Sequence, residues 1–169
     1  QAVPFLYGDE MKTLRKDRNP SFECCEACYF MAWRNGQIVG RIAAIINHRA
    51  NEKWNCKVVR FDWFDFIDDE EVSAALLQTA AEWGRKRGMT EIAGPLGFTD
   101  MDREGLLIEG FDSLATMYIN YNYPYYQRHI ERLEGFRKDN DYLEYRIRIP
   151  EVAPPKVGKL AEMIVSRYN

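Results

Sequence analysis

The chain has 169 residues, a length that suits one domain with a sizeable core, and its composition is 46% hydrophobic and 14% aromatic. Such a composition excludes a disordered or low-complexity protein. The formal net charge is −3, and no cluster of Lys or Arg stands apart from neighbouring acids. The sequence therefore lacks the basic surface that nucleic-acid binding requires.

Signals for membrane insertion and secretion are missing from the sequence. No apolar run reaches the roughly 18 residues that a membrane-spanning helix needs, and the first residues lack the layout of a signal peptide. We therefore expect a soluble, cytoplasmic protein with no membrane partner. The chain starts at Gln1 and not at Met, so the sequence does not tell whether a leader or a longer segment precedes it.

The cysteines raise the question of a metal site, because Cys24, Cys25 and Cys28 are close in sequence. A structural zinc site needs a further pair of Cys or His ligands at regular spacing, and the sequence supplies none. Reduced, partly buried thiols and no bound metal are the prediction.

Three β-strands are predicted in the first half of the chain. Two β-rich runs within Glu26–Asn47 are joined by Asn35-Gly36. Both residues of this dipeptide tolerate the positive φ of a type I′ turn, so the two runs predict a hairpin. The run Lys57–Phe66 is dense in aromatic and β-branched residues and predicts a third strand.

A helix is predicted after Phe66. Its apolar residues recur with helical spacing, at Val72, Leu76, Ala80 and Trp83. The acids Asp68–Glu71 stand at its start and basic residues at its end, as the helix macrodipole favours, and Gly88 suits its C-terminal cap.

A short buried strand is predicted over Met89–Pro95, where it ends at a Gly-Pro pair. Tight connections between strand, helix and strand indicate a crossover, which makes the strands Lys57–Phe66 and Met89–Pro95 parallel. The predicted fold class is therefore α/β (α+β) with a mixed sheet.

Shorter elements are predicted further along the chain. Residues 96–119 indicate a long ordered loop with one helical turn. Pro124 opens a helix that extends to about Glu134 and is closed by Gly135.

The alternating run Asp139–Pro150 predicts a last strand, which completes a domain of residues 1–150. Residues 151–169 predict a linker and a short amphipathic helix. This helix either packs on the domain or begins a second domain.

This order of elements resembles that of the GNAT superfamily of acyl-CoA N-acyltransferases. The motif NGQIVGRIAAIIN at Asn35–Asn47 is similar to the second hairpin strand of that family. The motif YYQRHIERLEGFRKDNDYLEYRI at Tyr125–Ile147 is similar to its terminal helix, Gly-Phe turn and strand. Other segments, such as AEWGRKRGMTEIAGP at Ala81–Pro95, resemble a bacterial group of larger GNAT-like proteins, the YghO type.

The resemblance spans residues 1–150 and implies a twisted, mostly antiparallel mixed sheet with a central strand–helix–strand crossover and flanking helices. In YghO-type proteins more sequence follows the GNAT-like domain, so the resemblance implies a second domain in the full-length chain. The sequence does not tell whether residues before Gln1 contribute the first strand and helix of the family.

In GNAT enzymes, acyl-CoA lies between two splayed strands, and its pyrophosphate sits on the N–H groups that open the following helix. The resemblance places this site on five residues, namely Phe66, Ile67, Glu71, Val72 and Ser73. The basic or amide position of the family falls on Asp68, and its two small positions fall on Glu71 and Ser73. Carboxylates at a helix start already take the role of an anion and repel phosphate. The loop therefore predicts weakened binding of acetyl-CoA or another acyl-CoA. In this interpretation the acids have a structural role and cap a helix that is exposed to solvent.

The general base of the superfamily is often a carboxylate on the fourth strand, which implies Asp62 or Asp65 here. Residues three apart on a strand point to opposite faces, so one of the two faces the cleft. We expect this residue to be Asp65, which lies nearer the C-terminal end of the strand. His48 and Glu26 are the alternatives.

Many GNAT enzymes protonate the departing thiolate with a tyrosine four residues before the Gly-Phe turn. Glu131 occupies this position, so Tyr125 and Tyr126 are the candidates for the acid. The alternative for both tyrosines is a packing role at the start of a helix.

The resemblance thus implies an acyl-CoA-dependent N-acyltransferase with a degenerate pyrophosphate loop, whose acceptor is a small-molecule or peptide amine. The alternative is a GNAT-like ligand-binding or interdomain scaffold without catalytic activity, which the acids Asp68–Glu71 favour. A third interpretation takes the aromatic loop Tyr118–Tyr126 as a protein-contact surface.

Overall fold

The computed structural model describes residues 6, 8–116, 118–148, 151–152 and 154–168. The chain divides into two compact units, Gln1–Asp139 and Asn140–Asn169. The second unit contains helix α5 (Pro155–Tyr168), and the elements described below lie in the first. The predicted domain limit at residue 150 stays a prediction.

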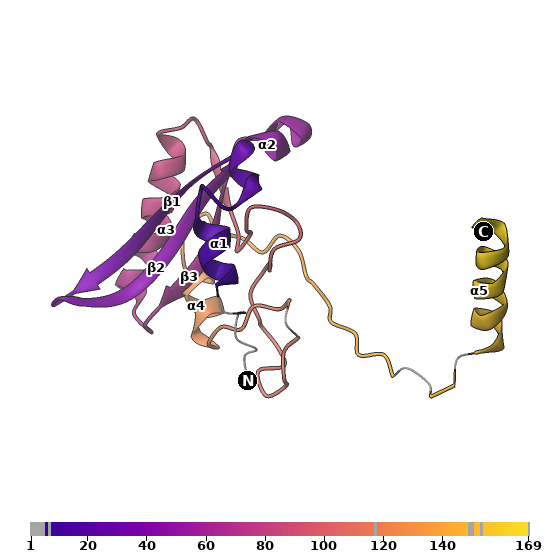
Figure 1. Ribbon diagram of the computed structural model, residues 1–169. Helices are drawn as coiled ribbons and strands as arrows, with labels where there is room; N and C mark the ends of the chain where they lie inside the picture. Colours follow the sequence, from indigo (N-terminus) through magenta and orange to yellow (C-terminus); the bar gives the residue numbers. More distant parts are fainter. Residues whose placement is uncertain (1–5, 7, 117, 149–150, 153, 169) are drawn as a thin grey trace. The chain divides into compact units, whose positions relative to one another are not determined.

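A four-stranded sheet forms the centre of the first unit (Figure 1). Its order is β1 (Cys25–Arg34), β2 (Gln37–Asn47), β3 (Val58–Phe66) and β4 (Glu91–Ala93). The first three strands are antiparallel neighbours, and β3 and β4 are parallel. This mostly antiparallel sheet with one parallel crossover confirms the predicted fold class.

The hairpin between β1 and β2 turns at Asn35 and Gly36, whose φ angles are 50° and 76°. Positive φ at both positions defines a type I′ turn, and Arg34 pairs with Gln37 across it. The hairpin prediction is confirmed.

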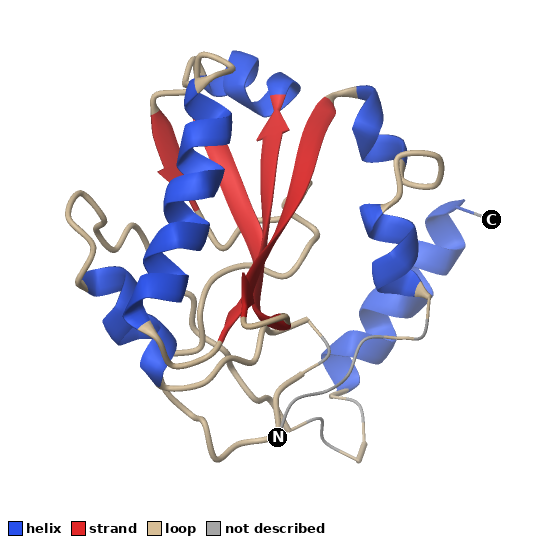
Figure 2. Ribbon diagram, turned by 90° about the vertical axis from the view of Figure 1, so that its left-hand side faces the viewer, coloured by secondary structure: helices blue, strands red, loops and turns tan. Residues whose placement is uncertain are grey.

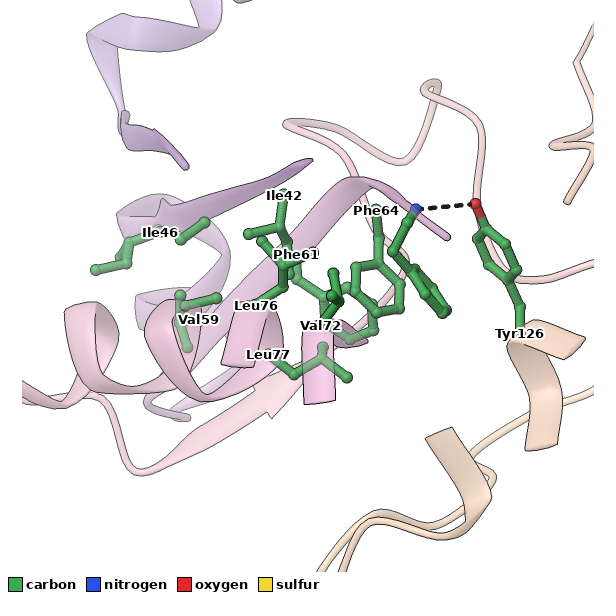
Figure 3. Packing of buried hydrophobic residues seen from close by; sticks show 12 residues of the cluster. Ile42, Ile46, Val59, Phe61, Phe64, Val72, Leu76, Leu77 and Tyr126 are labelled. Carbon is green, nitrogen blue, oxygen red and sulfur yellow. Dashed lines mark hydrogen bonds between the residues drawn. The ribbon is translucent and has the colours of Figure 1, made fainter. Parts of the chain in front are cut away.

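Helix α3 (Glu70–Arg85) links β3 to β4 and covers one face of the sheet, as Figures 1 and 2 show. Asp69 caps its start, and Gly88 follows its end with a φ of 82°. Leu76 and Leu77 pack into the main core against alternate residues of β2 and β3 (Figure 3). Burial of such a side chain contributes about 1.5–3 kcal/mol, so this interface is the main support of the fold.

The opposite face of the sheet carries a smaller core of Cys25, Ala43, Ile45 and Phe98. Helix α1 (Asp9–Leu14) lies on this face, because the hydroxyl of Tyr29 donates to the carbonyl of Leu14 at 2.8 Å. The short helices η1 (Pro20–Glu23) and α2 (His48–Trp54) flank β1 and β2.

The loop after β4 is ordered by side chains that replace a strand partner. The buried Asn122 accepts from the N–H of Leu107 at 2.7 Å and donates to its carbonyl at 3.1 Å. Helix α4 (Tyr125–Glu131) follows and is shorter than predicted. Its C-terminal end tightens into a turn in which the N–H of Leu133 donates to the carbonyl of Ile130.

The prediction of a last strand over Asp139–Pro150 is wrong for the described part of that run, because residues 140–148 form no strand. Alternation of side chains is compatible with a strand, but a strand forms only where its backbone N–H and C=O groups can hydrogen-bond to a neighbouring strand. Among the described residues no such neighbour is paired with this run. Residues 149 and 150 lie outside the described residues.

Candidate functional site

The candidate site lies where β3 separates from β4. The two strands pair only between Val58–Arg60 and Glu91–Ala93. The C-terminal half of β3 therefore has no partner strand on this side among the described residues, and its backbone groups must find other partners. An opening of this kind between parallel strands is the feature that the GNAT resemblance predicts for this part of the fold.

A bulge in β3 determines which side chains reach the site. Trp63 has a φ of 46°, and the pairing with β2 shifts here, so that Asp65 lies opposite Arg41 and Asp62 lies opposite Ala43. Arg41 and Ala43 are two residues apart and share one face of β2, so Asp62 and Asp65 share that face too. The prediction that these two acids point to opposite faces is wrong, because the bulge inserts one extra residue between them.

The two carboxylates differ in their surroundings. Asp65 has a half-exposed side chain and pairs with Arg41, whose Nε donates to Oδ2 at 2.7 Å. Asp62 is partly buried and is bonded to the N–H of Trp63. Burial, followed by the nearby charges of Asp102 and Asp65, raises the pKa of Asp62 from its ordinary value of 3.8 to about 7. Asp62 is thus the better proton acceptor of the pair near neutral pH.

Tyr125 and Tyr126 of α4 close the free end of β3. The hydroxyl of Tyr125 donates to the carbonyl of Phe66 at 2.5 Å. The hydroxyl of Tyr126 accepts from the N–H of Phe66 at 3.4 Å, drawn in Figure 3, and donates to Asp65 at 3.3 Å. Burial raises the pKa of both tyrosines, so both stay protonated at neutral pH. The structure therefore brings together three of the predicted site residues, Asp65, Tyr125 and Tyr126.

The acids at the start of α3 all have basic partners from other elements. Asp69 accepts from the N–H of Val72 at 3.1 Å, and Arg34 of β1 bonds both Asp69 and Glu71, at 2.6 and 2.8 Å. Arginines from the end of the chain's α4 region hold the remaining acids: Arg128 of α4 pairs with Asp68 at 2.8 Å, and Arg132, the C-cap of α4, pairs with Glu70.

These basic partners were not predicted, because the acids were interpreted from their own helix alone. A signal was present in the sequence: Arg128 and Arg132 are four residues apart, a spacing that puts two side chains on one face of a helix.

A buried chain of hydrogen bonds connects α3 to α4. Ser73 Oγ lies 2.8 Å from His129 Nδ1, and His129 Nε2 lies 2.7 Å from an Asp68 oxygen. These residue types match a Ser-His-Asp triad, but Ser73 is only 1% exposed and His129 only 2%. A substrate cannot reach the Ser73 hydroxyl in this position, so the chain of bonds joins two helices and holds no nucleophile.

The residues predicted to hold the pyrophosphate of acyl-CoA do not fit that group in this structure. The carboxylate of Asp69 occupies the helix start, and Val72 and Ser73 turn their side chains into the core. Hydrogen bonds from Arg34 lower the pKa of Asp69, and hydrogen bonds from His129 lower the pKa of Asp68, so both stay charged. A phosphate at this position would meet two carboxylates and displace one.

Comparison with known proteins reveals two relatives. The chain is 35% identical to protein YghO of Escherichia coli K12 over 163 residues, which cover 96% of the chain and 41% of YghO. It is 28% identical to a bacterial ceramide synthase of Caulobacter vibrioides over 176 residues, which cover 97% of the chain and 46% of that enzyme. Over almost its whole length the chain is thus similar to a part of YghO. It spans less than half the length of either relative.

Two further comparisons are less informative. No family model matches the chain. A solved structure described as a "Putative acetyl transferase from Pyrococcus furiosus" matches with a TM-score of 0.45 and 15% identity, over 86% of this chain and 82% of that protein. A match at this level supports no conclusion about activity.

A membrane-spanning helix and a metal-binding cluster are both absent from the described part of the chain. Within residues 6, 8–116, 118–148, 151–152 and 154–168, no helix is long and apolar enough to cross a membrane. The same residues contain no group of three or more His, Cys, Asp or Glu side chains arranged to hold a metal ion.

Proposed function

We propose that this chain forms the amine-binding part of an N-acyltransferase that moves an acyl group from acyl-CoA to a primary amine in the cytoplasm. The observation that carries the proposal is the position of Asp62, a partly buried carboxylate with a pKa of about 7 beside the opening between β3 and β4. Similarity to a ceramide synthase supports it, because a ceramide is an N-acylated long-chain amine. We take a long-chain amine as the acceptor class.

The chemistry needs a base and a protonated group. The amine nitrogen forms a bond to the thioester carbon, the carbon–sulfur bond breaks, and the thiol leaves with one proton. A primary amine is protonated near neutral pH, so it must lose a proton before attack and a second one afterwards. Asp62 is suited to accept a proton, because its pKa of about 7 lies near the working pH. Tyr125 and Tyr126 hold Phe66 and Asp65, and Tyr125 is the less buried of the two and the better candidate for the acid.

The proposal is tested by thiol release from acyl-CoA in the presence of a long-chain amine. General base catalysis contributes about 100- to 10,000-fold, so Asp62→Asn is expected to lower kcat by about 100-fold or more. Asp65→Asn is the matched comparison, since it removes a neighbouring carboxylate from the same face; it is expected to raise the KM for the amine and to lower kcat far less than Asp62→Asn does. Equal losses in both variants, or no amine-dependent release in the full-length protein, would refute the role of Asp62.

The phosphates of acyl-CoA require a separate site in this proposal, because the start of α3 is closed by Asp69. We infer that a second domain of the full-length protein supplies this phosphate site. The chain covers 41% of YghO and 46% of the ceramide synthase, so both relatives contain enough further sequence for such a domain.

A second candidate function is a GNAT-like scaffold that binds no acyl-CoA, and the cap formed by Asp69 and Arg34 favours it. Calorimetric titration with acetyl-CoA separates the two candidates. The full-length protein is compared with a variant in which the four acids Asp68–Glu71 are changed to Asn or Gln. Micromolar binding by the unmodified protein would exclude the scaffold. Binding by the neutralised variant alone would show that the acids exclude the coenzyme.

A further inference from the structure

An exposed apolar surface lies at the turn end of the β1–β2 hairpin. Four large side chains form it, and we call them the hairpin patch: Met31 (55% exposed), Trp33 (59%), Ile38 (54%) and Ile67 (45%). Single exposed apolar residues are common, but large apolar side chains gathered on one face indicate a contact surface.

The strand register places these four side chains together. Trp33 pairs with Ile38, and Ile67 extends the pairing of β3, because its N–H donates to the carbonyl of Val39 at 3.0 Å. Phe30 and Ala32 face the core under α3, so Met31 and Trp33 face away from it. Trp33 and Ile38 thus form one row across the hairpin, and Ile67 lies beside Val39, just beyond the last residue of β3.

The same register connects the hairpin patch to the carboxylates. Met31 pairs with Arg41 and Arg41 pairs with Asp65, so these three residues form the next row. Asp65 lies two residues before Ile67, which directly follows the last residue of β3, and extended backbone separates two such residues by about 7 Å. Asp62 belongs to the third row, opposite Ala43 and Tyr29.

Helix α1 contacts Arg41 of the second row and Tyr29 of the third row. Glu10 of α1 pairs with Arg41 at 3.1 Å, and the carbonyl of Leu14 accepts from the hydroxyl of Tyr29 at 2.8 Å. An apolar strip thus starts in solvent and leads to a partly covered pair of acids. This arrangement matches the two ends of an amphiphile with a hydrocarbon chain and a cationic head.

We propose that the hairpin patch binds the hydrocarbon chain of a long-chain primary amine, whose ammonium group lies at Asp65 and Asp62. This inference rests on the proposed function for the reaction that follows, but the binding itself does not require catalysis. The charges at the site favour an amine over a second copy of the chain. A second copy would bury the exposed ion pair of Arg41 and Asp65, which costs desolvation free energy, whereas an ammonium group is attracted by the two carboxylates.

Tryptophan fluorescence tests this inference directly, because Trp33 is part of the patch. The probe is dodecylamine below its micelle concentration, with butylamine as the short-chain comparison and dodecanoate as the chain with an anionic head. Trp54→Ser removes another exposed tryptophan, on α2 at the other end of β2, and keeps Trp33 as the exposed reporter. We expect saturable binding of dodecylamine with a blue shift in this variant.

Two substitutions at exposed positions, Trp33→Ser and Ile38→Asn, are expected to weaken dodecylamine binding at least tenfold, since each removes a contact with the hydrocarbon chain. Calorimetric titration measures the affinity of Trp33→Ser, because this variant lacks the fluorescent reporter. Asp65→Asn is expected to weaken dodecylamine binding and to leave dodecanoate unaffected.

Several outcomes would overturn the inference. These are equal binding of dodecanoate and dodecylamine, unchanged affinity in Ile38→Asn, and self-association that Ile38→Asn abolishes while dodecylamine has no effect. Binding to phospholipid vesicles in place of the free amine would equally overturn it. Amine binding without acyl transfer leaves this inference intact and removes the proposed function, so the two can fail separately.

Discussion

Replacement of Asp62 by Asn should make the folded protein more stable at alkaline pH. The folded pKa of Asp62 is about 7, against an ordinary value of 3.8, a difference of about three pKa units. Each unit corresponds to about 1.4 kcal/mol, so the charged form costs the folded state up to about 4 kcal/mol. The folded state binds the proton more tightly, so this cost is absent below about pH 4, grows as pH rises, and is complete above about pH 7.

The Asn side chain keeps the shape of Asp62 and an oxygen for the N–H of Trp63, but carries no charge. We therefore expect Asp62→Asn to raise the free energy of unfolding at pH 8 by about 2–4 kcal/mol and to change it little at pH 4. Urea unfolding followed by circular dichroism at several pH values measures this difference. Asp65→Asn is the control, because loss of its half-exposed ion pair with Arg41 is worth at most about 1 kcal/mol. A stability gain that is equal at pH 4 and pH 8, or a loss at pH 8, would refute the buried charge at Asp62.

Further predictions concern packing and hydrogen bonding in the core. Ser73→Ala leaves Nδ1 of the buried His129 without its partner and should lower the free energy of unfolding by about 1–3 kcal/mol in urea titrations; an unchanged midpoint would contradict the role of this bond. Gly84→Ala places a Cβ at 2.5 Å from Val59 Cγ1. The steric clash is expected to destabilise the folded state by about 1–3 kcal/mol, which exceeds the stabilisation from the higher helix propensity of alanine, so the melting temperature should fall. Gly158→Ala in α5 meets no atom within 4 Å and should raise helix content in circular dichroism without lowering the melting temperature.

The predictions that succeeded depend on interactions between residues close in sequence. Asn35-Gly36 determines the hairpin, because a type I′ turn needs two residues that tolerate positive φ. The apolar period and the Asp69 cap determine α3, because a helix is stabilised through contacts three and four residues apart. The crossover from β3 to β4 follows from their short connections to α3.

The candidate site depends on contacts between distant parts of the chain. The amino-acid sequence by itself determined the hairpin, the helix and the presence of two acids on β3. Only the tertiary structure showed that the bulge at Trp63 turns Asp62 and Asp65 to one face, because alternation assumes an unbroken strand. Only the tertiary structure supplied Arg34, Arg128 and Arg132 to the acids of α3, since β1 and α4 lie 35 residues or more away in sequence and meet that helix start only in the folded chain.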